Sequence, residues 1–216
     1  MKFIKKILKF ILDLLFPLRC LGCRREDFWL CPACFEKLPL DPSYERFEKI
    51  LVFSASDYEK IIIKKIIKTC KFSSIQELAQ VAGKLLVRSV LKFPEIKDLL
   101  QHENDLLIVP IPLSSRRQRE RSFNQSLLIA QELSEHFSLP IIDGLKKIER
   151  QPQSELAAEK RSKNIANAFS WQGENLAGQK IILVDDVVTT GATLAEAAKV
   201  LKKAGAKKVI GLAVAR

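Results

Sequence analysis

The chain has 216 residues, enough for one well-packed core and a small additional module. A hydrophobic content of 47% excludes a disordered chain, and a formal net charge of +11 favours polyanionic partners such as nucleic acid, phosphorylated ligands or anionic lipid. Lysine-rich helix faces in solvent give the same charge, so this number assigns no function by itself.

Residues 1–16, MKFIKKILKFILDLLF, predict an amphipathic helix. At helical spacing its polar positions fall within one arc of roughly 100°. These positions are Lys2, Lys5, Lys6, Lys9 and Asp13. The segment is too short and too charged to span a bilayer, which needs about 20 apolar residues. Either its apolar face packs on the following module or on a partner, or the helix is a peripheral contact on the inner face of the membrane.

Four cysteines form two CxxC pairs, Cys20 with Cys23 and Cys31 with Cys34, with seven residues between the pairs. Each pair matches a zinc-knuckle turn, in which two thiolates from a tight loop bind one tetrahedral metal, and Gly22 permits this turn. Two disulfides are the alternative, but no export signal indicates an oxidising compartment. The pattern predicts a closed, structural zinc site in a cytoplasmic protein.

Strands and helices are expected to alternate after this module. The expected strands are 50–55, 106–109, 145–149, 180–184 and 208–214. The expected helices are 58–69, 75–92, 124–137 and 194–203, with a helix-compatible segment at 154–163. A polar loop is expected after Pro94, and Cys70 is expected in the core. This alternation predicts a mostly parallel sheet with helices on both faces.

The run from Ile181 to Thr193 carries the strongest chemical signal. Four apolar residues predict a strand buried on both faces, and Asp185 and Asp186 follow where that strand is expected to end. A Thr/Gly-rich turn then leads into a helix. Ligands of such sheets lie at the carboxyl ends of strands, and anions lie at helix N-termini. The run predicts a site for a small molecule that carries both hydroxyls and a phosphate.

The residue types in this run fit such a ligand. Backbone N–H groups of the turn would surround a phosphate, and Gly191 lets the backbone approach it. The phosphate-binding positions are Thr189, Thr190, Gly191, Ala192 and Thr193. Asp185 and Asp186 suit ribose hydroxyls or, through water, a Mg²⁺ ion. The motif resembles the phosphoribosyl diphosphate (PRPP) signature of type I phosphoribosyltransferases at all thirteen positions.

Two further segments are rich in polar residues. The strand at 106–109 is followed by a loop whose arginines can contact phosphate oxygens. These are Arg116, Arg117, Arg119 and Arg121. A solvated basic helix start is the alternative, but the position after a strand end favours a functional role. The segment 151–169 mixes amides and bases, and by itself indicates only a polar loop.

Together these segments resemble the ComF family, also called ComFC or GntX-like, from about residue 11 to 216. The family's leucine-rich lead-in matches a run that ends at Phe16-Pro17. Residues 110–125 match the family's block Pro-x-Pro-Leu…Arg-x-Arg-Gly-Phe-Asn-Gln, with Ser122 in place of its glycine. Its next block matches Pro152, Gln153, Leu156, Arg161, Asn164, Ala168 and Phe169. Lys160 stands where that block has an acidic residue.

The resemblance implies three parts: an N-terminal amphipathic helix (1–16), a zinc-ribbon-like module (17–45), and an α/β domain of the type I phosphoribosyltransferase-like fold (46–216). It implies that Asp185 and Asp186 are the catalytic carboxylates and that Mg²⁺ binds together with PRPP. The implied pyrophosphate-binding and loop residues are Arg116, Arg117, Arg119, Arg121, Asn124, Gln125, Gln153, Arg161 and Asn164.

The resemblance also implies a cytoplasmic role in natural transformation, with single-stranded DNA and DNA-uptake proteins as partners. Phe28, Trp29 and Phe35 either stack on bases or form a small core around the metal. Three functions are compatible with the sequence: a PRPP-binding phosphoribosyltransferase-like protein of DNA uptake, a nucleobase-salvage phosphoribosyltransferase, and a non-catalytic DNA-binding adaptor with a vestigial nucleotide site. The absence of an evident base-recognition segment counts against salvage, and the intact acidic pair counts against a vestigial site.

Overall fold

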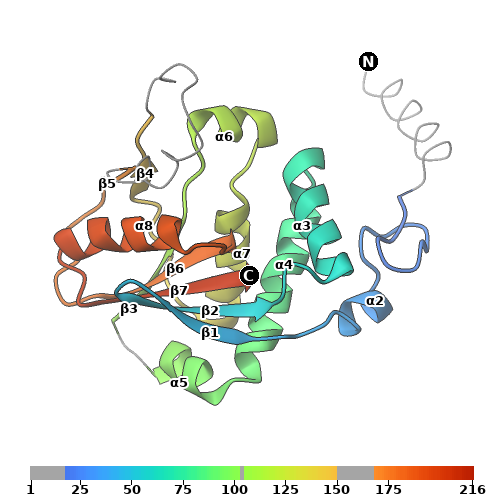
Figure 1. Cartoon of the computed structure of the whole chain (residues 1–216), viewed down its shortest axis with the longest axis horizontal. Coiled ribbons are helices and arrows are strands. Elements are labelled where there is room, and N and C mark those ends of the chain that lie inside the picture. The colour runs from blue at the N-terminus through green and yellow to red at the C-terminus, as the bar shows by residue number, and fades with distance from the viewer. Residues whose placement is uncertain (1–17, 103–104, 150–167) are drawn as a thin grey trace. The chain divides into compact units, whose positions relative to one another are not determined.

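The computed structural model describes residues 18–102, 105–149 and 168–216. The chain divides into two compact units, one up to Leu38 and one from Pro39 onward (Figure 1). In the first unit the short helix α2 (Pro32–Glu36) begins with proline at its first position, where a missing N–H is tolerated. The division lies before the boundary expected at residue 45, because β1 (Ser43–Phe47) pairs with the sheet of the second unit.

A five-stranded sheet forms the centre of the second unit, in the order β1-β2-β7-β6-β3. Its other strands are β2 (Ile50–Ser56), β3 (Leu106–Pro110), β6 (Lys180–Val187) and β7 (Lys208–Ala215). β2, β7, β6 and β3 run parallel, and β1 pairs antiparallel at the edge. The apolar runs of β6 and β7 are buried, as central parallel strands require. The predicted mostly parallel sheet is therefore confirmed.

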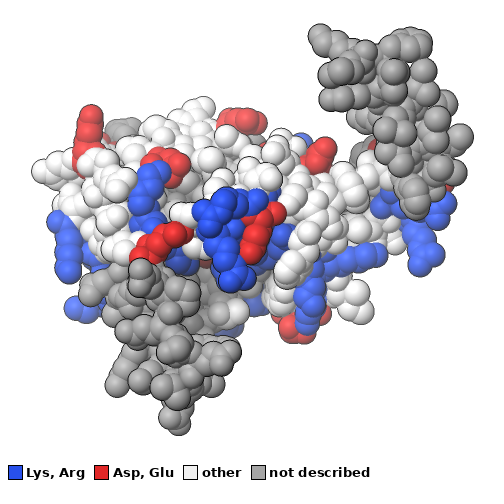
Figure 2. Space-filling view, turned by 90° about the horizontal axis from the view of Figure 1, so that it is seen from above, with Lys and Arg blue, Asp and Glu red and all other residues white. Residues whose placement is uncertain are grey.

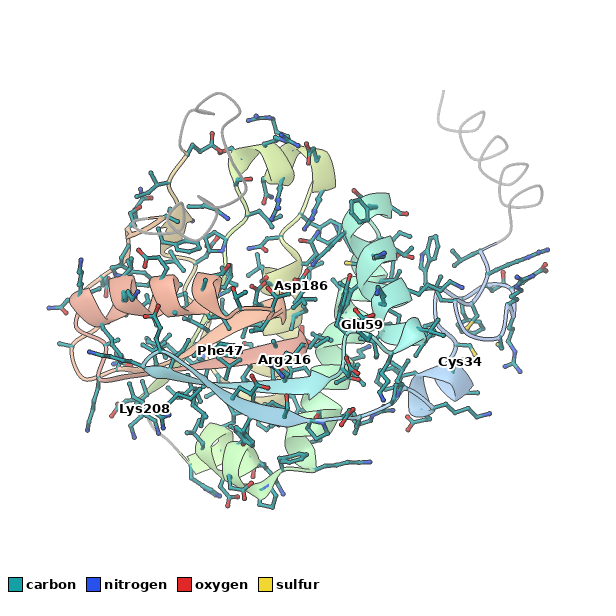
Figure 3. All side chains as sticks on the ribbon, in the orientation of Figure 1. Cys34, Phe47, Glu59, Asp186, Lys208 and Arg216 are labelled. Atoms are coloured by element: carbon teal, nitrogen blue, oxygen red, sulfur yellow. The ribbon has the colours of Figure 1, made fainter. Side chains whose placement is uncertain are left out.

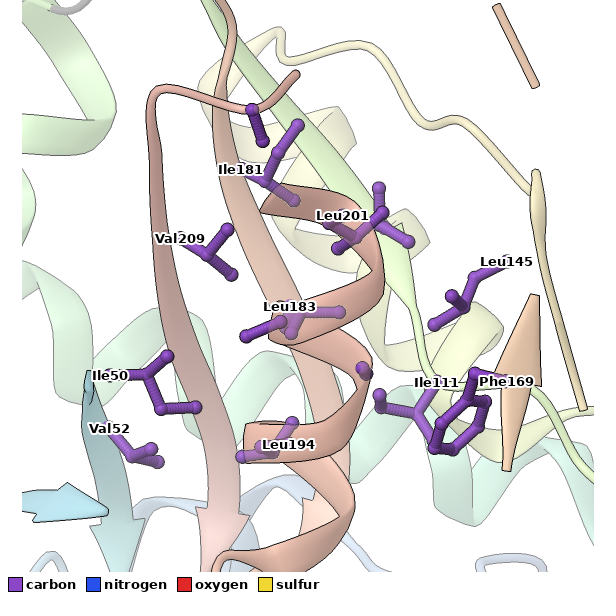
Figure 4. Close-up of a cluster of buried hydrophobic side chains, with 14 of the residues drawn as sticks. Ile50, Val52, Ile111, Leu145, Phe169, Ile181, Leu183, Leu194, Leu201 and Val209 are labelled. Carbon is purple, nitrogen blue, oxygen red and sulfur yellow. The ribbon is translucent and has the colours of Figure 1, made fainter. Parts of the chain in front are cut away.

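Helices cover both faces of this sheet. The helices of this unit are α3 (Ile61–Ser73), α4 (Gln76–Leu91), α5 (Pro94–His102), α6 (Ser115–Arg121), α7 (Gln125–Phe137) and α8 (Ala192–Lys203). On one face α8 packs against β2, β6 and β7, and Figure 4 shows Leu194 and Leu201 among the strand residues of this core. On the other face α4 and α7 pack on the strands and on each other, and α3 packs against α4.

Three elements differ from the sequence-based expectation. Where a polar loop is predicted after Pro94, the chain forms α5, because proline at the first helical position and Glu95 in the first turn favour a helix start. The arginine-rich segment forms α6. β6 continues to Val187, since its ladder with β7 extends to Ala215, so the acidic pair lies within the strand rather than after its end. The helix-compatible segment 154–163 lies outside the described residues.

A separate two-stranded sheet pairs β4 (Leu145–Lys147) with β5 (Phe169–Trp171). The strand expected at 145–149 is thus present in a shorter form. The ring of Trp171 lies where Gly144 or Gly173 would carry a Cβ, at 2.8 and 2.5 Å respectively, so both glycines are needed for this packing. β5 also contacts α8, which fixes this small sheet against the core.

Candidate functional site

The acidic pair lies at the carboxyl end of β6, where the parallel strands of the sheet end. Successive strand residues project in opposite directions, so the two carboxylates contact different helices. Asp185 Oδ1 accepts hydrogen bonds from Ser126 Oγ of α7 at 3.0 Å and from the Asp186 N–H at 2.8 Å. Asp186 Oδ2 lies 2.9 Å from Lys71 Nζ, and Figure 3 shows Asp186 on the side of the strand toward α3.

These two carboxylates have different electrostatic environments. Burial, together with the adjacent Asp186 carboxylate, raises the pKa of Asp185 to about 7, although the Asp186 N–H, Lys71 and Ser126 oppose the rise. Asp186 has the Lys71 ammonium as its counter-ion, and the side chains of this ion pair are only 14% and 22% exposed. Two adjacent carboxylates thus share one internal cation, which leaves acceptor capacity for hydroxyl donors or for a second cation.

The turn after β6 leads directly into the N-terminus of α8. Gly191 adopts φ 69° and ψ −3° at the N-cap of α8, a left-handed conformation that favours glycine. Thr189 and Thr190 are exposed, and Thr190 Oγ1 accepts a long hydrogen bond of 3.5 Å from the Ala192 N–H. Thr193 is half-buried in the first helical turn. The first N–H groups of a helix have no partner within it, so this turn can receive a phosphate.

Phe47, at the end of β1, supports this turn from the edge of the sheet. A Cβ on Gly191 would lie 2.2 Å from Phe47 Cγ, so the ring packs directly against the glycine. The guanidinium of Arg216 lies 5.9 Å from the centroid of the same ring, and Arg216 also forms an ion pair with Glu45 (Figure 3). Phe47 therefore lies between the glycine of the turn and a cation at the end of β7.

The four arginines of α6 divide into two paired and two unpaired residues. Figure 2 shows basic side chains gathered over this helix. Arg116 Nε lies 2.8 Å from Glu120 Oε1, and Arg121 Nη1 donates to Gln125 Oε1 at 3.1 Å. In the part of the chain that the structure describes, neither Arg117 nor Arg119 has an ion pair. Both side chains are exposed, and hydrogen bonds from Ser115, together with the charge of Arg119, lower the pKa of Glu149.

Asn124 and Gln125 form the start of α7. Asn124 Oδ1 accepts from the Ser126 N–H at 3.1 Å, and its Nδ2 donates to the Ile111 carbonyl at 3.0 Å, which joins α7 to the segment after β3. Gln125 is 1% exposed, and its Nε2 has no hydrogen-bond partner among the described residues. Asn124 therefore positions Ser126, which in turn holds Asp185.

Sequence reasoning missed Lys71, Ser126 and Phe47. Lys71 is one of several lysines along α3, and Ser126 is an ordinary residue in a first helical turn, so no local pattern marks either of them. Phe47 belongs to a strand that the sequence does not predict. The predicted site residues Gln153, Arg161 and Asn164 lie outside the described residues.

The four cysteine Sγ atoms of the first unit lie within 4.8 Å of one another, and none forms a disulfide. Cys23 and Cys31 Sγ are 3.6 Å apart. Four thiolates at about 2.3 Å from a tetrahedral Zn²⁺ would be roughly 3.8 Å apart, so the cluster fits one shared ion. A Cβ on Gly22 would lie 2.7 Å from Cys34 Sγ, so this turn requires glycine.

Backbone donors favour the thiolate form of Cys20, whereas hydrogen bonds with Cys23 and Cys31 raise the pKa of the Cys34 thiol to about 12. The Cys31 N–H donates to Cys20 Sγ at 3.3 Å. Burial opposes ionisation of the Cys20 thiol, but hydrogen bonds from the backbone of Cys31, Cys23 and Gly22 lower its pKa to about 6. A thiolate at neutral pH is the form that binds a metal. The cluster is consistent with a structural zinc site.

Comparison with known proteins places this geometry in a family. A family model described as a phosphoribosyl transferase domain matches residues 124–215, from the end of the α6–α7 connection to β7. DNA utilization protein YhgH of Escherichia coli is 32% identical over 200 residues, which cover 88% of this chain and 85% of that protein. Competence protein F of Haemophilus influenzae is 29% identical over 194 residues, 88% of this chain and 81% of that protein. The chain belongs to the ComF family.

A third ComF-family relative matches over a shorter stretch. Competence protein ComFC of Bacillus subtilis is 35% identical over 105 residues, 48% of this chain and 41% of that protein. The ComF-family fold is confirmed as an α/β phosphoribosyltransferase-like domain that follows a four-cysteine cluster. Ser122, which replaces the family's glycine, adopts φ 63°, a conformation that favours glycine. Within the described ranges, no helix is long and apolar enough to cross a bilayer.

Proposed function

We propose that this ComF-family protein binds phosphoribosyl diphosphate at the carboxyl ends of β3 and β6 and acts with single-stranded DNA during DNA uptake. The observation that carries the proposal is the meeting of three features at one sheet edge: an acidic pair, a glycine-capped helix N-terminus and a basic helix. The acidic pair suits ribose hydroxyls, the helix N-terminus suits a terminal phosphate, and the basic helix suits a pyrophosphate.

Each part of this ligand has a defined set of protein groups. Asp185 and Asp186 accept hydrogen bonds from the ribose hydroxyls, and the 189–193 turn surrounds the 5′-phosphate with N–H groups. Arg117 contributes charge to the pyrophosphate from α6. A Mg²⁺ ion that arrives with the ligand would be held through water by the acidic pair, and it would neutralise charge that develops on a pyrophosphate leaving group. The ion pair with Lys71 orients the Asp186 carboxylate for this role.

The four cysteine thiolates of the first unit fit one structural Zn²⁺ ion, held by Cys20, Cys23, Cys31 and Cys34. When bound, the ion supplies folding free energy to the unit. A partnership with single-stranded DNA is supported by the net charge of +11 and by the basic surface over α6. It is also supported by the names of two relatives, which refer to competence and to DNA utilization.

Titration calorimetry with PRPP and Mg²⁺ tests the proposed site. The double variant Asp185→Asn/Asp186→Asn should lose at least roughly tenfold in affinity, because it removes charged acceptors from the ribose. Asp41→Asn is the matched control, since its carboxylate forms an exposed ion pair with Lys60. No heat with the wild-type protein would refute the proposal.

Two further measurements separate the alternative functions. Pyrophosphate release that depends only on a free nucleobase would assign the protein to salvage instead. Binding of a fluorescent single-stranded oligonucleotide, with and without a zinc chelator, measures the role of the cysteine unit. Unchanged DNA affinity after metal loss would remove that unit from the DNA-binding surface.

A further inference from the structure

A pocket of about 430 Å³ lies between α5 and the strands β1, β2 and β7. It contacts the first half of β7, from Lys208 to Gly211, whereas Asp186 lies level with the last residues of that strand (Figure 3). The pocket and the proposed PRPP site are therefore at different ends of the sheet. Pockets that bind small organic molecules have volumes of about 300–1,000 Å³, so this pocket has room for such a ligand.

The floor of the pocket is apolar and comes from two cross-strand pairs. Phe53 of β2 is the register partner of Tyr44 of β1, and Leu51 of β2 is the register partner of Ile210 of β7. Residues two apart on a strand project from the same face, so these four side chains form one surface. Leu51 is 36% exposed, which leaves part of this floor open to a ligand. The helix α5 adds two apolar residues to the lining, Ile96 and Leu99.

Two side chains of opposite charge line the pocket at its two ends. Lys208 lies two residues before Ile210 on the same face of β7. Glu95 lies in the first turn of α5. Burial, together with the Glu95 carboxylate, raises the pKa of Tyr44 to about 12, so Glu95 is close to the Tyr44 end of the floor. Among the described residues, neither Glu95 nor Lys208 has an ion-pair partner.

These two charges discriminate between classes of apolar ligand. A fatty acid would pair its carboxylate with Lys208, but it would leave the Glu95 carboxylate beside a hydrocarbon chain. A nucleotide carries only negative charge, which the Glu95 carboxylate repels. A ligand with an ammonium group at one end, a carboxylate at the other and apolar groups between them complements the floor and both ends.

The length of the floor determines how far apart the two charges of the ligand must be. Phe53 is level with Leu212, which follows Lys208 by four residues on β7. At about 3.3 Å per residue these two levels are about 13 Å apart, and the lysine and glutamate side chains shorten the gap. A free amino acid carries both charges on one carbon atom and is too short. An extended peptide of two or three residues spans about 7–10 Å.

We propose that this pocket binds a short apolar peptide of two or three residues with free ends. Its ammonium group lies at Glu95, its side chains lie on the floor of Leu51 and Phe53, and its carboxylate lies at Lys208. None of these residues belongs to the proposed PRPP site, so the pocket provides a second binding activity that does not depend on the proposed function.

Titration calorimetry of the full-length protein with the tripeptide leucyl-leucyl-leucine tests the pocket. Lys208→Met should weaken binding roughly threefold, because an exposed ion pair contributes modestly. Amidation of the peptide carboxylate should weaken binding to the wild-type protein by the same factor. It should have no further effect in Lys208→Met, since both changes remove the same contact. Lys203→Met is the charge-matched control, because Lys203 is exposed at the end of α8 outside the lining.

The other end of the peptide is tested in the same way. Acetylation of its ammonium group and Glu95→Gln should each weaken binding roughly threefold, and the two changes together should weaken it no further. Additive losses at both ends would overturn the proposed orientation. Equal affinity of the free peptide and of the peptide blocked at both ends would overturn the proposal, because the pocket would then not select charge.

Leu51→Asn tests the floor. It should weaken binding of the tripeptide at least roughly tenfold, because apolar contact area is lost at a position that is already partly exposed. Ile61→Asn, at an exposed apolar position on α3, is the matched control and should leave binding unchanged. Unchanged binding in Leu51→Asn, or no heat with the wild-type protein, would overturn the proposal. Loss of PRPP binding in Asp185→Asn/Asp186→Asn bears on the proposed function only, so the two failures are distinguishable.

Discussion

The two units of this protein differ in what holds them together. In the second unit the central strand β6 presents a run of four residues, Ile181 to Val184, each with 0% exposure. In the described part of the first unit only Cys20, Leu30, Cys31 and Leu38 are buried, and two of these are cysteines of the cluster. The second unit therefore folds on an apolar core, whereas the described part of the first has few buried apolar residues and a four-cysteine cluster that fits one structural ion.

The same contrast applies to function. Every described residue of the proposed PRPP site belongs to the second unit. The carboxylates and the 189–193 turn are held by strand ladders, helix caps and the Phe47 ring, none of which involves the cysteine cluster. Stability of the first unit and ligand binding by the second should therefore be separable.

Removal of zinc should have the largest effect, and it should be confined to the first unit. A zinc-selective chelator, or Cys31→Ala, should unfold that unit, because a structural zinc site contributes about 10–16 kcal/mol of binding free energy. PRPP affinity, measured by calorimetry with Mg²⁺ restored, should change less than about twofold. A loss of PRPP binding on chelation would show that ligand binding by the second unit depends on the first unit.

Thiol labelling provides the residue-level control for this prediction. The metal-free protein should expose the four cluster thiols to a labelling reagent. Cys70 should stay unreactive until the second unit unfolds, since it is 4% exposed and burial, together with the Asp186 carboxylate, raises its pKa to about 12. Rapid labelling of Cys70 in the metal-free protein would show that chelation opens both units.

Gly191→Ala should have an intermediate effect, on ligand binding above all. Alanine at φ 69° is strained by about 1–2 kcal/mol. Its Cβ would also collide with the Phe47 ring, and this collision should displace the 189–193 turn. PRPP affinity should fall at least roughly tenfold by calorimetry. Gly178→Ala is the matched control, because Gly178 has φ 83° but nothing within 4 Å of its added Cβ. Equal losses of affinity in both variants would refute the role of Phe47.

Ser122→Gly should have the smallest effect, a gain in stability of the second unit. Ser122 adopts φ 63° at the C-cap of α6, and glycine removes the left-handed strain at some cost in chain entropy. The net gain should be about 0.5–1 kcal/mol in urea unfolding. Ser138→Gly, at φ 56° on the C-cap of α7, should give a similar gain. Destabilisation by Ser122→Gly alone would mean that the hydroxyl makes a compensating contact.

Several parts of the fold could be read from local patterns. The apolar runs at 180–184 and 208–214 predict buried strands because a parallel sheet buries both faces of its central strands. β1 escaped prediction because it is an edge strand without an apolar run, and all five of its residues are at least partly exposed. α5 escaped prediction because only two of its residues, Ile96 and Leu100, are buried.

The sequence by itself determined the family, the acidic pair, the 189–193 turn and the four cysteines, because each of them is recognised from residues that lie close together in the chain. Only the tertiary structure decided which other residues complete these sites. Lys71 reaches Asp186 from α3, Ser126 reaches Asp185 from α7, and Phe47 packs on Gly191 from β1. Such contacts join elements far apart in the chain, and no local pattern of residues encodes them.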